Sequence, residues 1–120
     1  TNTMKLDYEK YNKNLNLYDT YSQAGQDLFV TKMLSNKNEG FFVEIGGSHP
    51  FESNNTFLLE KQYDWKGISL EFDADLVNLY NDNRENQSIL TDATTFNYLE
   101  YIKLPATVSW TTFSFSFHEK

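Results

Sequence analysis

FFVEIGG, residues 41–47, is the clearest strand-to-loop pattern in this chain of 120 residues. A short run of residues that favour β-structure breaks off there at two glycines. Such a bounded run is typical of a strand that is buried on both faces, as in a parallel sheet. The pattern therefore predicts a strand over 41–45 and a loop directly after it.

Helical and strand patterns alternate on both sides of this segment. Ser22 is expected to cap the helix that precedes it, and Asp73 or Asp75 is expected to open a helix further along. Another helix is expected to begin at Thr94 or Thr95. The expected elements are helices over 22–34, 55–64, 73–84 and 94–103, and strands over 41–45, 67–72 and 88–90.

The alternation of strands and helices with short connections is typical of a right-handed parallel α/β sheet. Each step from one strand to the next leaves room for one crossover helix. We therefore predict one partial, Rossmann-like domain over residues 21–110, with three to four parallel strands and flanking helices. Residues 1–20 are polar, show no clear period and are expected to form an N-terminal arm.

The C-terminal segment carries a different pattern, rich in phenylalanine and serine. A fourth strand is expected at 107–110, and Phe113, Phe115 and Phe117 alternate with serines as in a half-buried strand. Because no helix separates the two, the second is not expected to be a further parallel strand. It could pair as a hairpin, extend the fourth strand or remain as an exposed edge. Residues 111–120 are therefore treated as a divergent tail.

The composition argues against several classes of function. A net charge of −7 and a pI near 4.7 disfavour binding to nucleic acid or to an anionic membrane surface. The absence of cysteine excludes disulfides and thiolate metal sites, and with only two histidines no metal site is expected. No apolar run has the length of a membrane helix and no targeting signal is visible, so the cytoplasm is the default location.

Three of the predicted strands end in residues suited to hold a nucleoside, at the place where open α/β sheets bind ligands. Glycines after the first strand let the backbone approach a ligand closely. A carboxylate at the tip of the next strand can accept both ribose hydroxyls, with an aromatic ring beside it. An aspartate at the tip of the third can accept from the amine of an adenine. These residues are Gly46, Gly47 and Ser48, then Glu71 and Phe72, then Asp92.

Features of the first loop narrow the class of ligand. No glycine occurs between Gly47 and Gly67, so the GxGxxG pattern of dinucleotide sites is missing, as is the Gly-Lys-Ser/Thr of a phosphate loop. Glu44 lies two residues before Gly46, and a carboxylate there favours a ligand with a positive end over a pyrophosphate. S-adenosylmethionine fits, because it carries an ammonium group and a cationic sulfur and no phosphate. A nicotinamide-binding half-domain is the disfavoured alternative.

Four stretches, in this order, resemble the FkbM-type S-adenosylmethionine-dependent methyltransferases: YSQAGQDLFV (21–30), FFVEIGGSHPFESNNTFLLEK (41–61), DWKGISLEFD (64–73) and ILTDATTF (89–96). The resemblance implies a class I methyltransferase fold that acts on oxygen, commonly on a sugar or a related small molecule. The cofactor-side residues that it implies are Glu44, Gly46 and Gly47 at the amino-acid end, Glu71 at the ribose, and Asp92 with Ala93 at the adenine.

The chain departs from the family pattern after Pro105. Family members continue there into an acidic strand end and further strands, whereas residues 107–120 read TVSWTTFSFSFHEK, without an aspartate. The expected function is therefore O-methylation of a sugar or other small hydroxylated acceptor by a domain truncated after the fourth strand, with its catalytic residues unknown. The alternative is a non-catalytic cofactor-binding remnant or an inert fragment. A homo-oligomer formed through the exposed sheet edge is one conceivable partner arrangement.

Each candidate residue also has a purely structural interpretation. Glu71 could be a solvated strand end, and Asp92 could cap a helix. Glu44, inside an apolar strand, needs a partner, because burying an unpaired carboxylate is costly. His49 is the histidine nearest the loop and suggests a general base, but we expect it to shape the loop together with Pro50.

Overall fold

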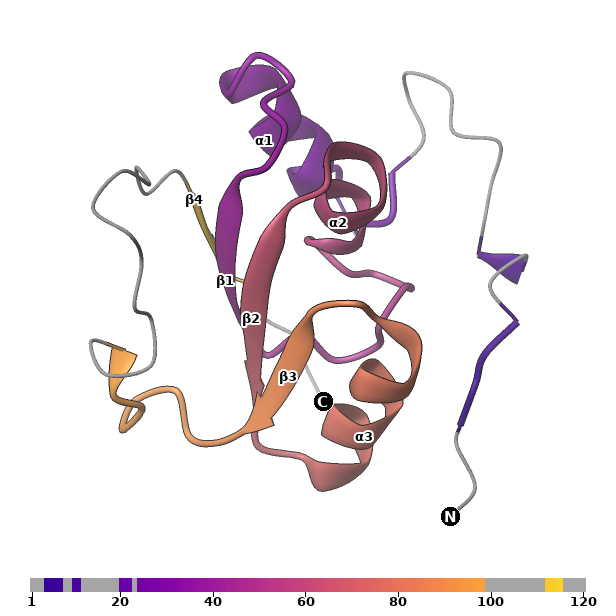
Figure 1. Cartoon of the computed structure of the whole chain (residues 1–120), viewed down its shortest axis with the longest axis vertical. Helices are drawn as coiled ribbons and strands as arrows, with labels where there is room; N and C mark the ends of the chain where they lie inside the picture. Colours follow the sequence, from indigo (N-terminus) through magenta and orange to yellow (C-terminus); the bar gives the residue numbers. More distant parts are fainter. Residues whose placement is uncertain (1–3, 8–9, 12–19, 23, 99–111, 116–120) are drawn as a thin grey trace.

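The computed structural model describes residues 4–7, 10–11, 20–22, 24–98 and 112–115. Within these residues, a four-stranded parallel sheet of order β3-β2-β1-β4 is flanked by three helices (Figure 1). The partial Rossmann-like α/β fold that the sequence predicts is confirmed. The elements are α1 (Gln26–Met33), β1 (Phe41–Ile45), α2 (Phe57–Tyr63), β2 (Lys66–Glu71), α3 (Ala74–Asn83), β3 (Gln87–Leu90) and β4 (Thr112–Phe115).

β1 lies inside the sheet, and its side chains are covered on both faces. Phe42 is completely buried on one face, where it packs with Leu59 of α2 and with Trp65. Val43 is buried on the opposite face, where it packs with Ile68 of β2. An apolar run without alternation is what such a doubly covered strand requires.

The helices adjoin the same face of the sheet, the one on which Phe42 lies. Val30 of α1 packs against the cluster that Phe42 forms with α2. The end of α3 is tied to α2 by the ion pair of Arg84 with Glu60. On the opposite face, the apolar strand residues are joined by side chains from the segment after β3. These side chains are Ala93, Phe96 and Tyr98.

α1 begins later than the sequence predicts. Its first residue is Gln26, and Gly25 precedes it with a φ of 77°, a conformation that glycine adopts without steric cost. Ser22 is therefore not the cap of the helix. Its hydroxyl oxygen still accepts a hydrogen bond from the backbone N–H of Asp27 at 3.0 Å, so it satisfies one of the free amides at the helix start.

α3 begins and ends where the sequence predicts. Asp73 caps the helix, and its side chain accepts hydrogen bonds from the backbone N–H groups of Asp75 and Leu76. The helix ends at Asn83, and Arg84 already has an extended backbone. Capping by aspartate followed by an apolar helix face was sufficient to locate this element from the sequence.

The helix predicted to begin at Thr94 or Thr95 does not begin there. Residues 93–95 form a turn instead, and the Asp92 carboxylate accepts hydrogen bonds from both the N–H and the hydroxyl of Thr94. The remainder of that predicted helix, beyond residue 98, lies outside the described residues. So does the strand predicted at 107–110.

β4 corrects the prediction for the C-terminal segment. Thr112–Phe115 is a parallel strand beside β1, with Glu44 in register with Ser114, although the sequence led us to exclude a further parallel strand. The exclusion was wrong because it counted the connection only from the strand predicted at 107–110, whose residues lie outside the described ones. The whole segment between β3 and β4 is long enough for a parallel crossover, which needs a dozen or more residues. β4 is the last strand in the order of the described sheet, and its parallel pairing was not among the arrangements that we considered.

The N-terminal arm is attached to the end of α3. The N–H of Met4 donates to Asp82 at 2.9 Å, and the N–H of Leu6 donates to Asn83 at 2.7 Å.

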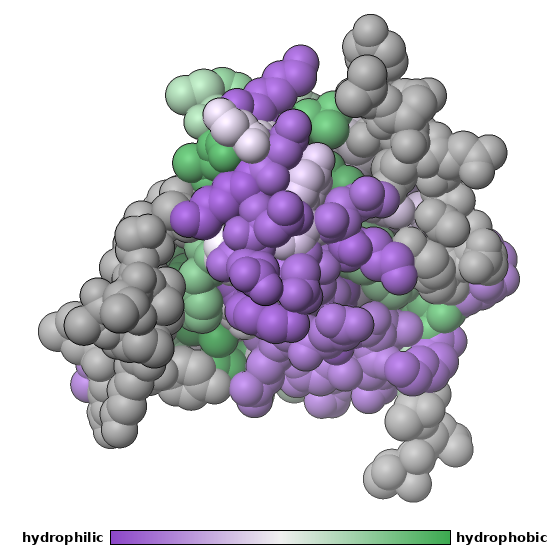
Figure 2. Space-filling model, turned by 45° about the horizontal axis from the view of Figure 1, so that its top comes forward, coloured by the Kyte–Doolittle hydropathy of each residue, from purple (hydrophilic) through white to green (hydrophobic). Residues whose placement is uncertain are grey.

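Hydrophilic residues form a broad area on the face shown in Figure 2, with hydrophobic patches around it. No helix formed by the described residues has the length and apolarity that crossing a bilayer demands.

Candidate functional site

The carboxyl ends of β1, β2 and β3 meet at one edge of the sheet and are joined by direct hydrogen bonds. The N–H of Gly46 donates to the Leu70 carbonyl at 2.8 Å. The N–H of Ser48 donates to the Glu71 carboxylate at 3.4 Å, and the N–H of Thr91 donates to the Glu71 carbonyl at 2.9 Å. The three predicted strand-end segments therefore lie side by side, with Glu71 in the middle. We call this the strand-end site.

The loop after β1 is shaped by its own packing. Gly46 and Ser48 have positive φ angles of 69° and 56°, the region in which glycine is favoured. A Cβ atom on Gly47 would lie 2.4 Å from Ser69 Oγ and 2.8 Å from Glu44 Oε1, closer than real contacts allow. Gly47 is thus required by the packing of the turn itself, and Gly46 is favoured there by its φ angle, whether or not a ligand binds.

Glu71 is buried and is not a solvated strand end. One of its carboxylate oxygens accepts hydrogen bonds from the N–H groups of Phe72 at 3.1 Å and Asp73 at 3.3 Å. Within the part of the chain that the structure describes, the other accepts only the longer bond from Ser48. A carboxylate oxygen has two lone pairs, so this second oxygen keeps the capacity to accept from a hydroxyl group.

Phe72 lies next to this acid and presents an apolar surface to solvent. Its relative exposure is 71%, and that of Leu90 on β3 is 55%. Glu71 and Leu90 are partners in the register of β2 and β3, so both apolar side chains lie near the acid. Exposed apolar groups next to a hydrogen-bonding carboxylate are the kind of surface on which a base or other flat ring can rest.

Asp92 and Ala93, after the third strand, make hydrogen bonds within their own turn. Asp92 is exposed, and the hydrogen bonds from Thr94, at 2.7 Å and 2.8 Å, lower the pKa of its carboxyl. The carbonyl of Ala93 accepts a hydrogen bond from the Tyr98 hydroxyl at 2.8 Å. Both residues therefore hold the turn after β3, and the helix that Asp92 could have capped does not begin at 93–95.

Glu44 lies on the helix-covered face and is completely buried. One carboxylate oxygen accepts from the Thr56 hydroxyl at 3.1 Å and from the Asn54 amide at 3.5 Å. Burial raises the pKa of Glu44, and the positive charge of Arg84 and the two hydrogen bonds oppose that rise. Among the described residues, its other oxygen and the neighbouring Ser69 hydroxyl have no hydrogen-bond partner. Glu44 therefore belongs to the interior and does not face the open edge.

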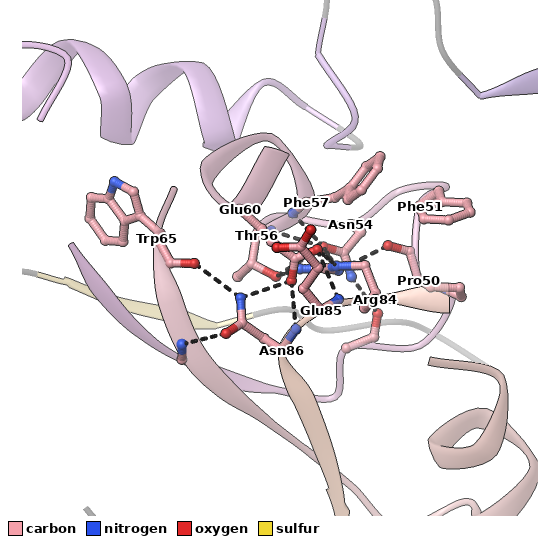
Figure 3. A network of polar contacts seen from close by, with 12 residues as sticks. Pro50, Phe51, Asn54, Thr56, Phe57, Glu60, Trp65, Arg84, Glu85 and Asn86 are labelled. Atoms are coloured by element: carbon pink, nitrogen blue, oxygen red, sulfur yellow. Dashed lines mark hydrogen bonds and ion pairs between the residues drawn. The ribbon is translucent and has the colours of Figure 1, made fainter. Parts of the chain in front are cut away.

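Arg84 is the centre of a buried polar network that fixes the loop between β1 and α2 (Figure 3). Its guanidinium makes a 2.8 Å ion pair with Glu60 and donates to the Pro50 carbonyl at 2.9 Å. It also donates to the Asn54 side-chain oxygen at 3.2 Å and to the Thr56 hydroxyl at 3.1 Å. The end of α3 thus holds the loop that begins with the two glycines.

No local pattern in the sequence singles out this network. Arg84 was expected only to mark the end of a helix, and Glu60 falls among polar residues of α2 that resemble an exposed face. Asn54 directly precedes the helix expected over 55–64, and α2 itself begins at Phe57. The Asn54 side-chain oxygen accepts from the N–H groups of Thr56 and Phe57, so an asparagine just before a helix was the one visible signal.

His49 shapes the loop, as the sequence suggests. Its Nδ1 atom accepts hydrogen bonds from the N–H groups of Phe51 at 3.0 Å and Glu52 at 2.8 Å. Burial lowers the pKa of His49, and the negative charge of Glu52 opposes this. With Nδ1 as acceptor, the neutral ring carries its proton on Nε2. The imidazole is therefore not arranged as a general base.

Comparison of the chain with models of protein families, with curated proteins and with solved structures finds no match. Within the described ranges, no group of three or more His, Cys, Asp or Glu side chains is placed to hold a metal ion. The site is thus characterised by its geometry: backbone amides, one buried carboxylate with spare acceptor capacity, and exposed apolar side chains.

Proposed function

We propose that the chain binds S-adenosylmethionine at the strand-end site and serves the O-methylation of a small hydroxylated acceptor, such as a sugar. The observation that carries the proposal is the position of Glu71, whose carboxylate and carbonyl accept from the loops on both sides. The residues expected at the ribose and at the glycine loop are neighbours, as a bound nucleoside requires.

The site suits the two ends of this cofactor unequally. Glu71 offers an acceptor for the ribose hydroxyls, and Phe72 offers an exposed ring beside it. Glu44, expected from the resemblance at the amino-acid end, is enclosed beneath Gly47. The proposal therefore assigns Glu71 and Phe72 a direct role, and it assigns Glu44 the role of supporting the loop.

When bound, the cofactor would supply an activated methyl group, and the chain's own contribution would be to bind and orient. Alignment of two reactants can account for a large part of the acceleration of such a transfer. The rigid loop between β1 and α2, held by Arg84, is suited to that task because its backbone is fixed by buried hydrogen bonds.

A second candidate function is cofactor binding without turnover. It is favoured by the arrangement of His49, whose acceptor nitrogen is used by two backbone amides. An acceptor hydroxyl that needs its proton removed would not find a free base at this imidazole. Turnover and binding must therefore be measured separately.

Titration calorimetry with S-adenosylmethionine tests binding. We expect the chain to bind the cofactor and Glu71→Ala to weaken binding about tenfold or more, since a hydrogen bond to a charged group contributes about 1.5–3 kcal/mol. Asp75→Asn, which removes a charge from the exposed first turn of α3, is the matched control and should bind normally. Circular dichroism verifies that each variant is folded.

Failure of the folded chain to bind the cofactor overturns the proposal, and so does unchanged affinity in Glu71→Ala. Transfer of labelled methyl to a panel of hydroxylated small molecules then separates the two candidates. Incorporation of label supports the methyltransferase, whereas binding without incorporation supports the second candidate.

A further inference from the structure

A cleft of about 420 Å³ lies between the N-terminal segment and the loop that joins β1 to α2. Its volume falls within the range of roughly 300–1,000 Å³ that is usual for small-molecule sites. We call it the arm cleft. It is lined by Lys10 and Tyr11, by residues 20–22, and by Phe51, Glu52 and Ser53.

The floor of the arm cleft is held in place by buried hydrogen bonds. Asp27 is completely buried and accepts from the N–H of Tyr21 at 2.9 Å and from the hydroxyl of Thr20. The carbonyl of Tyr21 accepts from the N–H of Asn54 at 3.0 Å, which ties this segment to the loop after β1. A site with a fixed floor loses little entropy when it binds a ligand.

The walls of the cleft combine aromatic rings with charged groups. The rings of Tyr11 and Phe51 are 5.3 Å apart between centroids, and Phe51, which is only 2% exposed, packs in turn on Phe57 at 4.5 Å, so Tyr11 is the ring of this pair that a ligand could reach. Lys10 and Glu52, from the two opposite segments, are both exposed. Aromatic faces bind the C–H face of a saturated ring, and a carboxylate and an ammonium group bind its hydroxyls.

The same loop serves the arm cleft and the strand-end site. His49 follows directly after Gly46–Ser48, and its ring lies 5.3 Å from that of Tyr11 and 6.1 Å from that of Phe51. Its Nδ1 atom fixes the backbone of Phe51 and Glu52, two of the residues that line the cleft. A ligand in the cleft would therefore lie against the loop whose first residues belong to the strand-end site.

We infer that the arm cleft is the acceptor subsite: it holds a hydroxylated six-membered ring, packed on Tyr11 and hydrogen-bonded by Glu52 and Lys10. The inference rests on the proposed function, because an acceptor has meaning only beside a bound methyl donor. It adds the location of the subsite and the residues that recognise the ring.

Saturation-transfer NMR with the full chain tests the inference, with D-glucose, D-mannose and D-galactose as separate probes. We expect at least one of them to receive saturation. Glu52→Gln should weaken its binding about tenfold, the effect of losing a hydrogen bond to a charged group. Glu85→Gln, a change of the same kind at an exposed residue outside the cleft, should leave binding unchanged. Tyr11→Leu, which removes the ring, should also weaken it.

Calorimetry with S-adenosylmethionine on the same samples separates the possible failures. If the cofactor binds and no sugar receives saturation, or Glu52→Gln and Tyr11→Leu bind as the unaltered chain does, the arm cleft is not the acceptor subsite and the proposed function is untouched. If the cofactor does not bind the folded chain, the proposed function fails and the inference fails with it. Affinity for the cofactor should differ less than twofold between Glu52→Gln and the unaltered chain.

Discussion

Gly47 is the residue at which the loop after β1 has no room for a side chain. The absence of a Cβ atom lets the loop close over Glu44 and Ser69, and this contact encloses the carboxylate. The same closure keeps the amides of Gly46 and Ser48 at the edge of the sheet. One small residue thus separates the buried polar interior from the strand-end site.

Gly47→Ala should therefore destabilise the protein by about 1–3 kcal/mol, the usual cost of forcing an extra carbon into a packed interior. Urea unfolding followed by circular dichroism measures the change. Combining Gly47→Ala with Ser69→Ala removes the nearest atom, Ser69 Oγ, and should recover part of the loss. Equal stability of Gly47→Ala and the unaltered chain would show that the loop is not packed as described.

Glu44 gives the protein a specific dependence on pH. Burial raises its pKa above the ordinary value of 4.5. At a pH between 4.5 and the raised pKa, the folded state therefore binds more protons than the unfolded chain. Its contribution to stability is fully present below pH 4.5 and is lost as the pH rises through the raised pKa. The variant Glu44→Gln has no ionisable group at this position, so its stability does not show this loss as the pH rises.

The free energy of unfolding of the unaltered chain, relative to that of Glu44→Gln, should therefore fall as the pH is raised above 4.5. Urea unfolding of both proteins over a series of pH values measures the difference. A difference that stays constant, or that grows in favour of the unaltered chain, would mean that the carboxyl is not held in a charge-disfavouring interior.

At the level of single residues, sequence reasoning located the strand-end residues but not their surroundings. Gly46 and Glu71 were found because strand ends are visible as breaks in apolar runs. The need of Glu44 for a partner was also visible, but its actual partners were not, because Asn54, Thr56 and Arg84 approach it only after folding. A side chain's partners across elements leave no mark in local sequence patterns.

The connection between α2 and α3 depends on one buried ion pair. Arg84 makes its hydrogen bonds to Glu60 and to the loop after β1 from a position where it is almost completely covered. Removing one member of such a pair leaves the other as an uncompensated buried charge. The connection is thus sensitive to single substitutions and more tolerant of a change that removes both charges.

Arg84→Met should cost about 3–5 kcal/mol of stability, and Arg84→Met combined with Glu60→Gln should cost less. Lys66→Gln, which breaks the exposed pair with Asp64, should cost less than about 1 kcal/mol. Urea unfolding measures the free energy of unfolding of all three variants. If Arg84→Met and Lys66→Gln prove equally mild, the network in Figure 3 does not hold the elements together.

His49 makes the loop between β1 and α2 sensitive to acid. Burial lowers the pKa of the ring from 6.5, so its contribution to stability is fully present above pH 6.5 and is lost as the pH falls towards the lowered pKa. A protonated Nδ1 cannot accept from the N–H groups of Phe51 and Glu52. These two amides should therefore lose protection against hydrogen exchange in acid.

Hydrogen exchange followed by NMR measures this effect. After correction for the intrinsic pH dependence of exchange, protection at Phe51 and Glu52 should fall below pH 6.5. The N–H of Phe57, which is bonded to Asn54, serves as the reference and should keep its protection. A parallel loss at all three amides would indicate general unfolding, and no loss at any of them would contradict the role of His49.

At the level of elements, the sequence predicted most of the sheet. β1, β2, β3 and α3 were visible because apolar runs, caps and glycine breaks are local features. The strand pattern at Phe113 and Phe115 was visible too, but its parallel pairing was wrongly excluded, since pairing beside β1 depends on a long connection and not on a local pattern. The turn at 93–95 was taken as a helix start because an aspartate followed by threonines caps both structures.

For the whole molecule, the order β3-β2-β1-β4 has one functional consequence. It places the ends of β1, β2 and β3 next to each other, and the loops that leave them share the hydrogen bonds of Glu71. The arm cleft lies along one of those loops. A donor at the strand-end site and an acceptor in the cleft would therefore be served by a single rigid loop.

NMR mapping of the backbone amides during titration with S-adenosylmethionine tests most directly whether the three strand ends form one ligand site. We predict that the largest shift changes occur together at Gly46–Ser48, at Phe72 and at residues 91–93, while the amides of α1 remain unchanged. Changes limited to one of these loops, or centred on α1, would contradict the existence of a single site at this edge of the sheet.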